Sequence, residues 1–199
     1  MKQVLIETQL FKPTKGLLSE GKMSERGNPL VHGILATCEV ENGNGRYYSE
    51  KLWKREIDKY MDLVKQNRAC GELDHPESQV VNLKNVSHNI KDINWDGKNI
   101  MGTIEILPTP SGNILKALID SGITVGVSSR GMGSLEQNGD IMEVQDDFEL
   151  LCWDFVSTPS NPGSFMTLKE GKENNINVYA KANSIVTEIL CANGNCPIF

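Results

Sequence analysis

The sequence predicts an α+β protein in which a closed or nearly closed, barrel-like antiparallel sheet is flanked by two helices. The first observation is a series of turn signals, at residues 42–45, Asp96-Gly97 and Asn138-Gly139, where Asn or Asp precedes a glycine that accepts positive φ. The second is that segments next to these turns alternate apolar and polar residues, as half-buried strands do. The third is that two segments carry a helical pattern.

The first half of the chain is predicted to contain two strands and one helix. A strand over Val4–Leu10 precedes a flexible arm, because residues 16–29 are rich in Lys, Gly, Ser and Glu. A second strand covers Val31–Glu41 and ends at the turn of residues 42–45. Ser49 then offers an N-cap to a helix that runs to about Gln66. The apolar stripe of this helix, which we expect to pack against the sheet, consists of Trp53, Ile57, Tyr60, Met61 and Val64.

The second half is predicted to alternate hairpins with a short helix. Val86–Leu107 has the pattern of a hairpin, and Asp96-Gly97 predicts a type I′ turn at its tip. A helix follows over Asn113–Ser121, and Gly122 stands at the C′ position, where glycine commonly ends a helix. The remaining elements are a strand with Ile123, Val125 and Val127 that leads into Ser128, a hairpin around Asn138-Gly139, and an apolar strand over Phe148–Val156.

The composition divides the chain into three parts. Residues 1–30 are predicted to form the N-terminal strand and flexible arm, and residues 31–165 the folded domain. Residues 166–199 are predicted to form a flexible tail, because from Gly171 onward the chain is rich in Asn and Lys and shows no sustained periodicity.

Charge and composition exclude several classes of function. The formal net charge is −6 and no run of Lys and Arg occurs, so no nucleic-acid partner is expected. No apolar stretch reaches membrane-spanning length and no signal-peptide core follows the polar N-terminus, so we expect a soluble protein made in a cytosol. Its five cysteines are scattered without clustered histidines, which predicts reduced structural thiols and neither a metal site nor a cofactor.

A polar group, Ser128-Ser129-Arg130, follows the alternating valines. In a strand, Ser129 shares a face with the valines, whereas Ser128 faces the opposite side. If the valines face the core, Ser128 faces away from it, beside Gly126, which leaves room for a substrate carbonyl. Ser128 is therefore the preferred candidate for a nucleophile, and Ser129 is its structural neighbour. The alternative is an ordinary strand that ends in a Ser-rich turn.

A serine nucleophile needs a base and a third group that orients this base. His32 and His88 fall inside predicted strands, where a hydrogen-bonded structural histidine is the usual explanation. His75 lies in a loop dense with polar residues, so it is the candidate base. Asp154 is the single charge among the apolar residues from Leu150 to Val156, where a buried carboxylate needs a partner, so it is the candidate orienting group. Arg130 is the alternative partner for this carboxylate.

Two motifs carry a resemblance to a known family. The segments Gly71-Glu72-Leu73-Asp74-His75-Pro76 and Gly126-Val127-Ser128-Ser129-Arg130-Gly131 resemble the prohead core proteases of large contractile-tailed bacteriophages. These are serine endopeptidases whose fold is related to the assemblins of herpesviruses, so the resemblance implies an assemblin-like fold and a protease domain over residues 31–165. The resemblance also includes Gly45-Arg46-Tyr47-Tyr48, Gly131-Met132-Gly133-Ser134-Leu135 and Trp153-Asp154-Phe155-Val156.

Carried over to this sequence, the resemblance implies Ser128 as nucleophile, His75 as general base and Asp154 as the orienting group. Assemblins use a second histidine as the third member, so His88 is an alternative to Asp154. Backbone N–H groups around Ser129 and Arg130 could form the oxyanion hole, since a strand that ends in a Gly-bounded turn frees such donors. Arg130 could instead anchor this segment through a salt bridge. The resemblance implies no cofactor and no metal.

The resemblance also implies the substrates and the location. Such enzymes act in the host cytoplasm inside the assembling prohead, where they cleave scaffold or core proteins and major capsid proteins. They cut after Glu when Leu or Ile stands two positions before it and a small residue follows. We also expect this chain to form a homo-oligomer and to bind neither nucleic acid nor membrane.

The same cleavage pattern occurs within this chain. Four Glu residues have Leu or Ile two positions upstream, namely Glu7, Glu20, Glu143 and Glu170. Only Glu20 and Glu170 precede a glycine, Gly21 and Gly171 respectively, and both flank the predicted core. They are therefore predicted self-processing sites, and cleavage at Glu170–Gly171 would remove the tail. Glu143 falls in a predicted hairpin strand, which cannot enter an active site unless the sheet unfolds.

Two other functions compete with this interpretation. One is a catalytically inactive scaffold or core protein of the prohead that shares the fold, although the joint presence of His75, Ser128 and Asp154 argues against it. The other is a small serine esterase, which is disfavoured because the chain lacks the Gly-x-Ser-x-Gly motif at Ser128.

Overall fold

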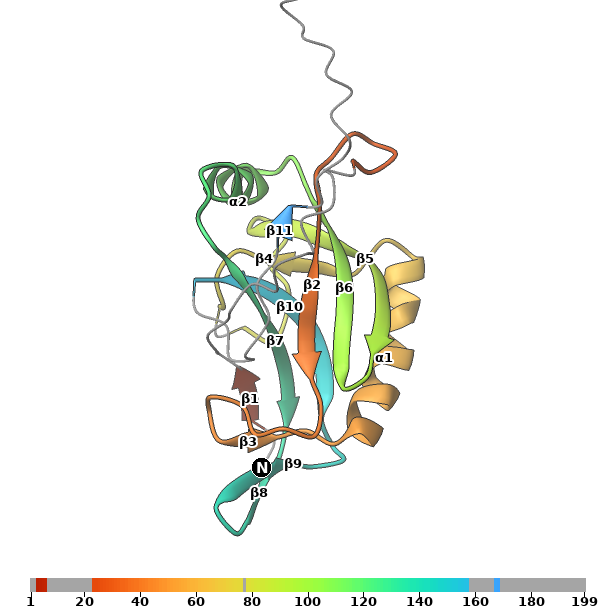
Figure 1. Ribbon diagram of the computed structural model, residues 1–199, viewed down its shortest axis with the longest axis vertical. Helices are drawn as coiled ribbons and strands as arrows, with labels where there is room; N and C mark the ends of the chain where they lie inside the picture. Colours follow the sequence, from red (N-terminus) through yellow and green to blue (C-terminus); the bar gives the residue numbers. More distant parts are fainter. Residues whose placement is uncertain (1–2, 7–22, 77, 158–166, 169–199) are drawn as a thin grey trace, which may run out of the picture.

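The computed structural model describes residues 3–6, 23–76, 78–157 and 167–168 of the 199-residue chain (Figure 1). Within these residues it is a mixed fold that consists mostly of strands, with two helices. In chain order the elements are β1 (Gln3–Ile6), β2 (Leu30–Thr37), β3 (Arg46–Tyr47), α1 (Glu50–Lys65), β4 (Cys70–Glu72), β5 (Val86–Asp96), β6 (Asn99–Ile106), α2 (Pro110–Asp120), β7 (Gly126–Gly133), β8 (Leu135–Asn138), β9 (Ile141–Val144), β10 (Glu149–Val156) and β11 (Thr167–Leu168).

The described strands form three sheets, and the closed or nearly closed barrel-like sheet that was predicted is not formed. The two larger sheets have the orders β1-β7-β10 and β11-β2-β6-β5-β4, and a small sheet has the order β3-β9-β8. A parallel bridge between Leu73 and Phe155 joins the two larger sheets where β4 approaches β10. In the described part of the chain no strand pairing connects β2 or β11 back to β1 or β7, so the joined sheets remain open at that end.

Helix α1 begins at the predicted N-cap and covers the strand that carries Asp154. Ser49 Oγ accepts a hydrogen bond from the backbone N–H of Leu52 at 3.2 Å, as an N-cap residue does. Trp53 of the helix stacks on Trp153 of β10, with ring centroids 6.1 Å apart. Tyr60 meets the same Trp153 ring edge-on at 4.9 Å, and all three rings are buried. This aromatic contact fixes the helix against β10.

Two local predictions need correction at the turns and helix ends. The β5–β6 hairpin occurs as predicted, but its loop residues are Gly97 and Lys98, and only Gly97 has positive φ, at 58°. This pattern fits a type II′ turn and not the predicted type I′ turn. Helix α2 begins at Pro110, three residues before the predicted start, because Thr109 caps it and proline suits the first helical position. Neither helix in the described residues is long and apolar enough to cross a membrane.

The two ends of the described chain are both paired in sheets. Strand β1 is antiparallel to β7, from Gln3 opposite Gly133 to Ile6 opposite Arg130. The rest of the predicted N-terminal strand, residues 7–10, lies outside the described residues. Strand β11 pairs with β2 and falls within the segment that was predicted as a flexible tail. The predicted self-processing residues, which are Glu20, Gly21, Glu170 and Gly171, lie outside the described residues.

Gly71 permits the close approach of β4 to β10. A Cβ atom at this position would lie 2.0 Å from the carbonyl oxygen of Trp153 and 2.4 Å from the ring of His88. Both distances are far inside van der Waals contact, so only glycine fits without a shift of the backbone. The glycine therefore allows the segment that follows β4, which contains His75, to lie directly against β10.

Candidate active site

Strands β7 and β10 bring three polar side chains onto one face of their sheet. Asp154 lies opposite Ser128, and Cys152 lies opposite Arg130, in the antiparallel register of the two strands. Directly opposed residues point to the same face, with Cβ atoms about 4.5–5.5 Å apart. Ser128 is 1% exposed, and Arg130 and Asp154 are fully buried. The predicted nucleophile and orienting group are therefore neighbours within the protein interior.

The loop after β4 carries His75 to the same face. Leu73 forms the bridge to Phe155, and the backbone N–H of Asp74 donates a hydrogen bond of 2.8 Å to the Phe155 carbonyl. Asp74 has φ 64°, a left-handed conformation that a residue with a side chain adopts at some cost. The chain reverses at this point, and His75 Nδ1 comes to lie 2.8 Å from Asp154 Oδ2. The structure thus joins the predicted base to the predicted orienting group.

This contact determines which ring nitrogen of a neutral His75 carries the hydrogen. Burial alone would raise the pKa of Asp154, but hydrogen bonds from His75 and from the Glu72 backbone N–H, together with the charge of Arg130, lower it below its usual range. An ionised carboxylate only accepts hydrogen bonds, so Nδ1 of His75 must carry the proton that it donates. Nε2 is then an acceptor when the ring is neutral. This is the nitrogen that a general base needs.

A hydrogen bond between Ser128 and His75 is not formed in this structure. His75 Nε2 is buried and has no hydrogen-bond partner among the described residues. In unliganded enzymes the hydrogen bond between nucleophile and base is often long and shortens only when substrate binds. The structure therefore brings His75 and Asp154 into direct contact, and it brings Ser128 to Asp154 through the strand register.

Arg130 holds the carboxylates of the site together. Its Nη2 donates to Glu72 Oε1 at 2.9 Å, and its Nε lies 2.9 Å from Asp154 Oδ2 in an ion pair without hydrogen-bond alignment. Its Nη1 donates to the backbone carbonyl of Ser78 at 2.7 Å, so the guanidinium also fixes the chain beyond His75. Its Nη2 further contacts Sγ of Cys152 at 3.1 Å. One buried cation thus connects β4, the loop, β7 and β10.

The ionic side chains around His75 carry an excess of negative charge. The side chains of Arg130, Glu72 and Asp154 are fully buried in the two ion pairs, and their formal charges sum to −1 while His75 is neutral. A proton on His75 brings the sum to zero. A positive charge on the imidazole would therefore be compensated within a region of low dielectric constant.

Sequence analysis did not identify Glu72 or Cys152 as members of this group. Glu72 Oε1 accepts from Arg130 and from the backbone N–H of Asn82 at 3.0 Å. One signal in the sequence could have indicated Glu72. Arg130 and Asp154 both stand in apolar strands, and a buried guanidinium can pair with a second carboxylate besides that of Asp154. Burial, which has the largest effect, and the contact with Asp154 raise the pKa of the Cys152 thiol, against an opposite effect of Arg130. It therefore remains a neutral thiol.

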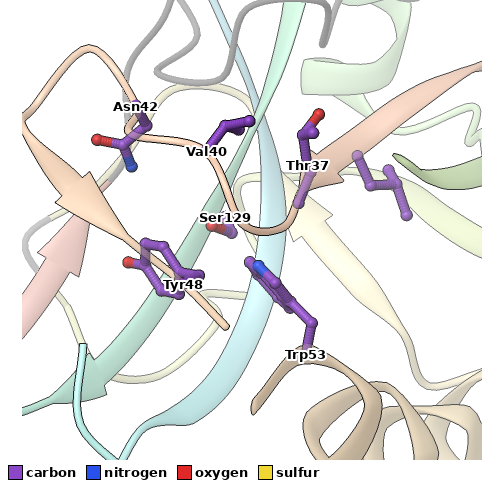
Figure 2. A pocket seen from close by; sticks show the side chains of 8 residues that line it. Thr37, Val40, Asn42, Tyr48, Trp53 and Ser129 are labelled. Carbon is purple, nitrogen blue, oxygen red and sulfur yellow. The ribbon is translucent and has the colours of Figure 1, made fainter. Parts of the chain in front are cut away.

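Ser129 faces the opposite side of β7, as the two-residue periodicity predicts. It lines a pocket together with Thr37, Val40, Asn42, Tyr48 and Trp53, and Leu35 and Ala36 complete the lining (Figure 2). Trp53 belongs to α1, so this pocket lies on the core side of the sheet. The two adjacent hydroxyls are thus separated by the sheet, and Ser128 is the one on the face of Asp154.

His88, the alternative third member, is held by other groups. Its Nε2 lies 3.0 Å from the Trp153 carbonyl, and its Nδ1 lies 2.9 Å from Ser87 Oγ. A carbonyl only accepts, so Nε2 carries the proton and Nδ1 accepts from the hydroxyl. Burial lowers the pKa of His88 to about 4, against smaller opposite effects of Asp154 and the Trp153 carbonyl. The ring therefore stays neutral at neutral pH, and both nitrogens have partners other than His75.

The basis for the predicted oxyanion hole needs correction. Strand β7 does not end at Ser129-Arg130 but continues to Gly133, with β10 on one side and β1 on the other side from Arg130 onward. The Gly-bounded turn that was expected to free backbone N–H groups is absent from these residues. A role of the backbone of Ser129 and Arg130 in binding an oxyanion stays a prediction. The Arg130 side chain itself forms the salt bridges that the alternative prediction required.

The described residues show no arrangement for a bound metal. Among them no group of three or more His, Cys, Asp or Glu side chains could hold an ion. Cys38, Cys70 and Cys152 are free thiols, whereas Cys191 and Cys196 lie outside the described residues.

Comparison with known proteins gives three matches that agree. The model of the prohead core protein serine protease family matches residues 9–176 of this chain. The prohead core protein protease of Enterobacteria phage T4 is 33% identical over 145 residues, which cover 70% of this chain and 68% of that protein. The solved structure of the capsid assembly protease of bacteriophage T4 has a TM-score of 0.67 and 29% identity, and covers 80% of this chain and 98% of that chain. The family match spans the positions of His75, Ser128 and Asp154.

The burial of His88 predicts a pH dependence of stability. The unfolded chain takes up a proton on this histidine near pH 6.5, whereas the folded protein takes it up only near its pKa of about 4. The unfolded state therefore binds more protons between these values, and the free energy of unfolding should fall by ~3 kcal/mol as the pH is lowered through this window. The stabilisation from ionised Asp154 is lost only at lower pH, because its pKa lies below 3.8.

Urea unfolding at several pH values between 7 and 4 measures this effect. His88→Gln should be less stable at pH 7 but should lose most of the pH dependence in this window. His32→Gln, at a partly buried histidine on β2, is the matched control and should retain it. Equal slopes in the wild type and in His88→Gln would contradict the assignment.

Proposed function

The chain belongs to the prohead core protein serine protease family, and we propose that it is an endopeptidase of prohead maturation in which Ser128 is the nucleophile, His75 the general base and Asp154 the group that orients the base. The observation that carries the proposal is the partly buried hydrogen bond of 2.8 Å between His75 Nδ1 and Asp154 Oδ2, on the face where Ser128 stands opposite Asp154. The fixed tautomer supports the role of base, since it leaves Nε2 able to accept a proton.

The proposed reaction proceeds by acyl transfer. His75 Nε2 removes the proton from Ser128 Oγ as this oxygen attacks the carbonyl carbon of the scissile peptide bond. The imidazolium then donates its proton to the nitrogen of the leaving amine, and the peptide bond breaks to leave an acyl-enzyme. A water molecule, deprotonated by His75, attacks the acyl carbon and releases Ser128. Asp154 stays ionised throughout and holds the ring in position.

The burial of the site supports a polypeptide substrate that enters in an extended form. Ser128 is 1% exposed and the side chain of His75 is 8% exposed. A folded surface cannot reach such groups, so a substrate must supply an unpaired strand and displace part of the covering chain. The exclusion of water by this covering strengthens each electrostatic interaction in the site.

The proposed substrates are the scaffold or core proteins and the major capsid protein of the same phage, cleaved inside the assembling prohead. The T4 relatives are named as a prohead core protein protease and a capsid assembly protease, which supports this assignment. The proposed cleavage site is Leu or Ile, any residue, then Glu, followed by a small residue. The presence of this pattern at Glu20–Gly21 and Glu170–Gly171 supports self-processing by the same site.

The two adjacent serines should differ sharply in their effect on activity. Ser128→Ala should lower kcat by a factor on the order of 10⁶, because it removes the hydroxyl that stands opposite Asp154 in the β7–β10 register. Ser129→Ala is the matched control and should be much milder, since this side chain lies on the core side of β7. Cleavage of a quenched fluorescent Leu-x-Glu-Gly peptide measures both rates.

The opposite ranking of the two variants would show that Ser129 is the nucleophile. A correctly folded wild type that cleaves no peptide, and whose Ser128 does not react with a fluorophosphonate probe, would instead favour the inactive scaffold or core protein.

Self-processing should remove the C-terminal tail. Active protein is expected to cut itself at Glu170–Gly171 and at Glu20–Gly21, and intact-mass measurement over time reports both products. Glu170→Gln should slow the C-terminal cut without affecting the cleavage of a separate peptide, because it removes the charge that the enzyme recognises. Glu173→Gln is the control, since Gly171 and not Leu or Ile stands two positions before it.

Ser128→Ala should keep its full mass over the same period. A wild-type protein that retains Phe199 while it cleaves other substrates would contradict the proposal of self-processing at Glu170.

A further inference from the structure

Strand β1 lies along β7 directly beside the candidate nucleophile. Leu5 is opposite Gly131 and Ile6 is opposite Arg130, and the described pairing stops there. Toward the start of β7, Ser129 and Ser128 pair with β10 on the other side, and no described strand pairs with them on the side of β1. The edge of β7 next to Ser128 is thus the direct continuation of the edge that β1 occupies.

The β1 register defines where an extended peptide would sit on this edge. In an antiparallel pair, each step forward along the peptide is one step back along β7. A peptide whose Leu lies opposite Gly131 therefore has its second residue opposite Arg130, its third opposite Ser129 and its fourth opposite Ser128. For the sequence Leu-x-Glu-Gly, the Glu falls opposite Ser129 and the Gly opposite Ser128. The scissile bond between them then lies beside the nucleophile.

The sequence of β1 itself matches this pattern. Leu5 occupies the position that the register assigns to the Leu of a substrate, and Leu5-Ile6-Glu7 is one of the Leu-x-Glu sequences of the chain. Leu5 is 1% exposed and belongs to the apolar core, so its position is a closed apolar site that suits Leu or Ile. The requirement for Leu or Ile two positions before Glu then has a physical cause.

A cation stands at the end of β1, where the Glu of a substrate would follow. Arg46 Nη1 donates to the Ile6 carbonyl at 3.0 Å, and Asn44 Nδ2 donates to the same oxygen at 2.9 Å. The turn of residues 42–46 presents both side chains, because Asn42 Oδ1 accepts from the backbone N–H groups of Asn44 and Arg46, each at 3.0 Å. Gly45 has φ 70°, which this turn requires. The guanidinium therefore lies one peptide unit from the position of the Glu.

The side chain of that Glu would point to the face of β7 that carries Ser129. A residue opposite Ser129 points to the same face as Ser129, which is the face with the pocket of Figure 2. The residues that line this pocket include Ser129, Asn42 and Tyr48 beside several apolar side chains. The guanidinium of Arg46 is the nearby group that a carboxylate at this place could pair with.

We propose that β1 occupies the place of the substrate: an extended Leu/Ile-x-Glu segment displaces it, pairs with β7 in the same register, and is recognised through its Glu by Arg46. This inference rests on the proposed protease function and adds the binding track and the residue that determines specificity. It also assigns a role to the Gly45-Arg46-Tyr47-Tyr48 motif.

The recognition of Glu is tested with two peptides that differ only in charge. The ratio of kcat/KM for a Leu-x-Glu-Gly peptide to that for a Leu-x-Gln-Gly peptide is measured in each protein. Arg46→Gln should reduce this ratio about 10- to 100-fold, the size of a charge-assisted hydrogen bond, and Arg46→Lys should restore part of it. Arg68→Gln, at an exposed arginine beyond α1, should leave the ratio at its wild-type value. A purely structural Arg46 would lower both rates equally, which would overturn the assignment.

The competition by β1 is tested with a second pair of variants. Leu5→Ala should weaken β1 on β7 and so lower KM for the Leu-x-Glu-Gly peptide several-fold without a loss of kcat, because fewer molecules have the track occupied. Leu115→Ala removes an equally buried leucine on α2 and should leave KM unchanged. An unchanged or raised KM in Leu5→Ala would overturn the proposal. If Arg46→Gln does not fold, the KM of Leu5→Ala is the deciding test. A wild type that cleaves neither peptide would instead overturn the proposed protease function.

Discussion

The buried ion pairs of Arg130 are the interaction on which the site depends. The guanidinium and the side chains of Glu72 and Asp154 are all excluded from solvent, and burial of such charges is costly unless each has a partner. The loss of one partner from a buried pair typically costs about 3–5 kcal/mol, because it leaves an uncompensated charge. The residues therefore constrain one another: β4, β7 and β10 must meet with these side chains in contact.

This constraint explains how a loop histidine is held with the accuracy that the proposed proton transfer needs. Arg130 forms an ion pair with Asp154 and donates a hydrogen bond to the backbone carbonyl of Ser78, which follows His75 in the chain. On the other side of His75, the backbone N–H of Asp74 donates to the Phe155 carbonyl. His75 lies between these attachments and donates to a carboxylate that cannot rotate away. The two carboxylates of Glu72 and Asp154 exceed the single charge of Arg130, and the His75 ring lies against this excess of negative charge. The packing of the strands and the electrostatic surroundings of His75 thus depend on the same three side chains, Arg130, Glu72 and Asp154.

Much of the site followed from local patterns, since strand periodicity alone separated Ser128 from Ser129 and the lone charge of Asp154 required a partner. The helix from Ser49 and the β5–β6 hairpin were predictable for the same reason, because capping residues and turn glycines act over a few positions. The failures involve long-range contacts. The open sheets depend on where β4 meets β10, and the membership of Glu72 depends on a guanidinium 58 positions away in sequence. Composition alone could not show that the His75 motif and the Ser128 motif belong to one site. The resemblance to prohead proteases indicated this.

The most direct test of this account compares the kcat of Asp154→Asn with that of His88→Gln on the same Leu-x-Glu-Gly peptide, with circular dichroism to establish that both variants are folded. The account predicts a loss of ~10⁴ in Asp154→Asn, because the imidazole loses the acceptor that fixes its tautomer. It predicts little loss in His88→Gln, because both nitrogens of that ring are engaged with Trp153 and Ser87. A fully active Asp154→Asn together with an inactive His88→Gln would contradict it.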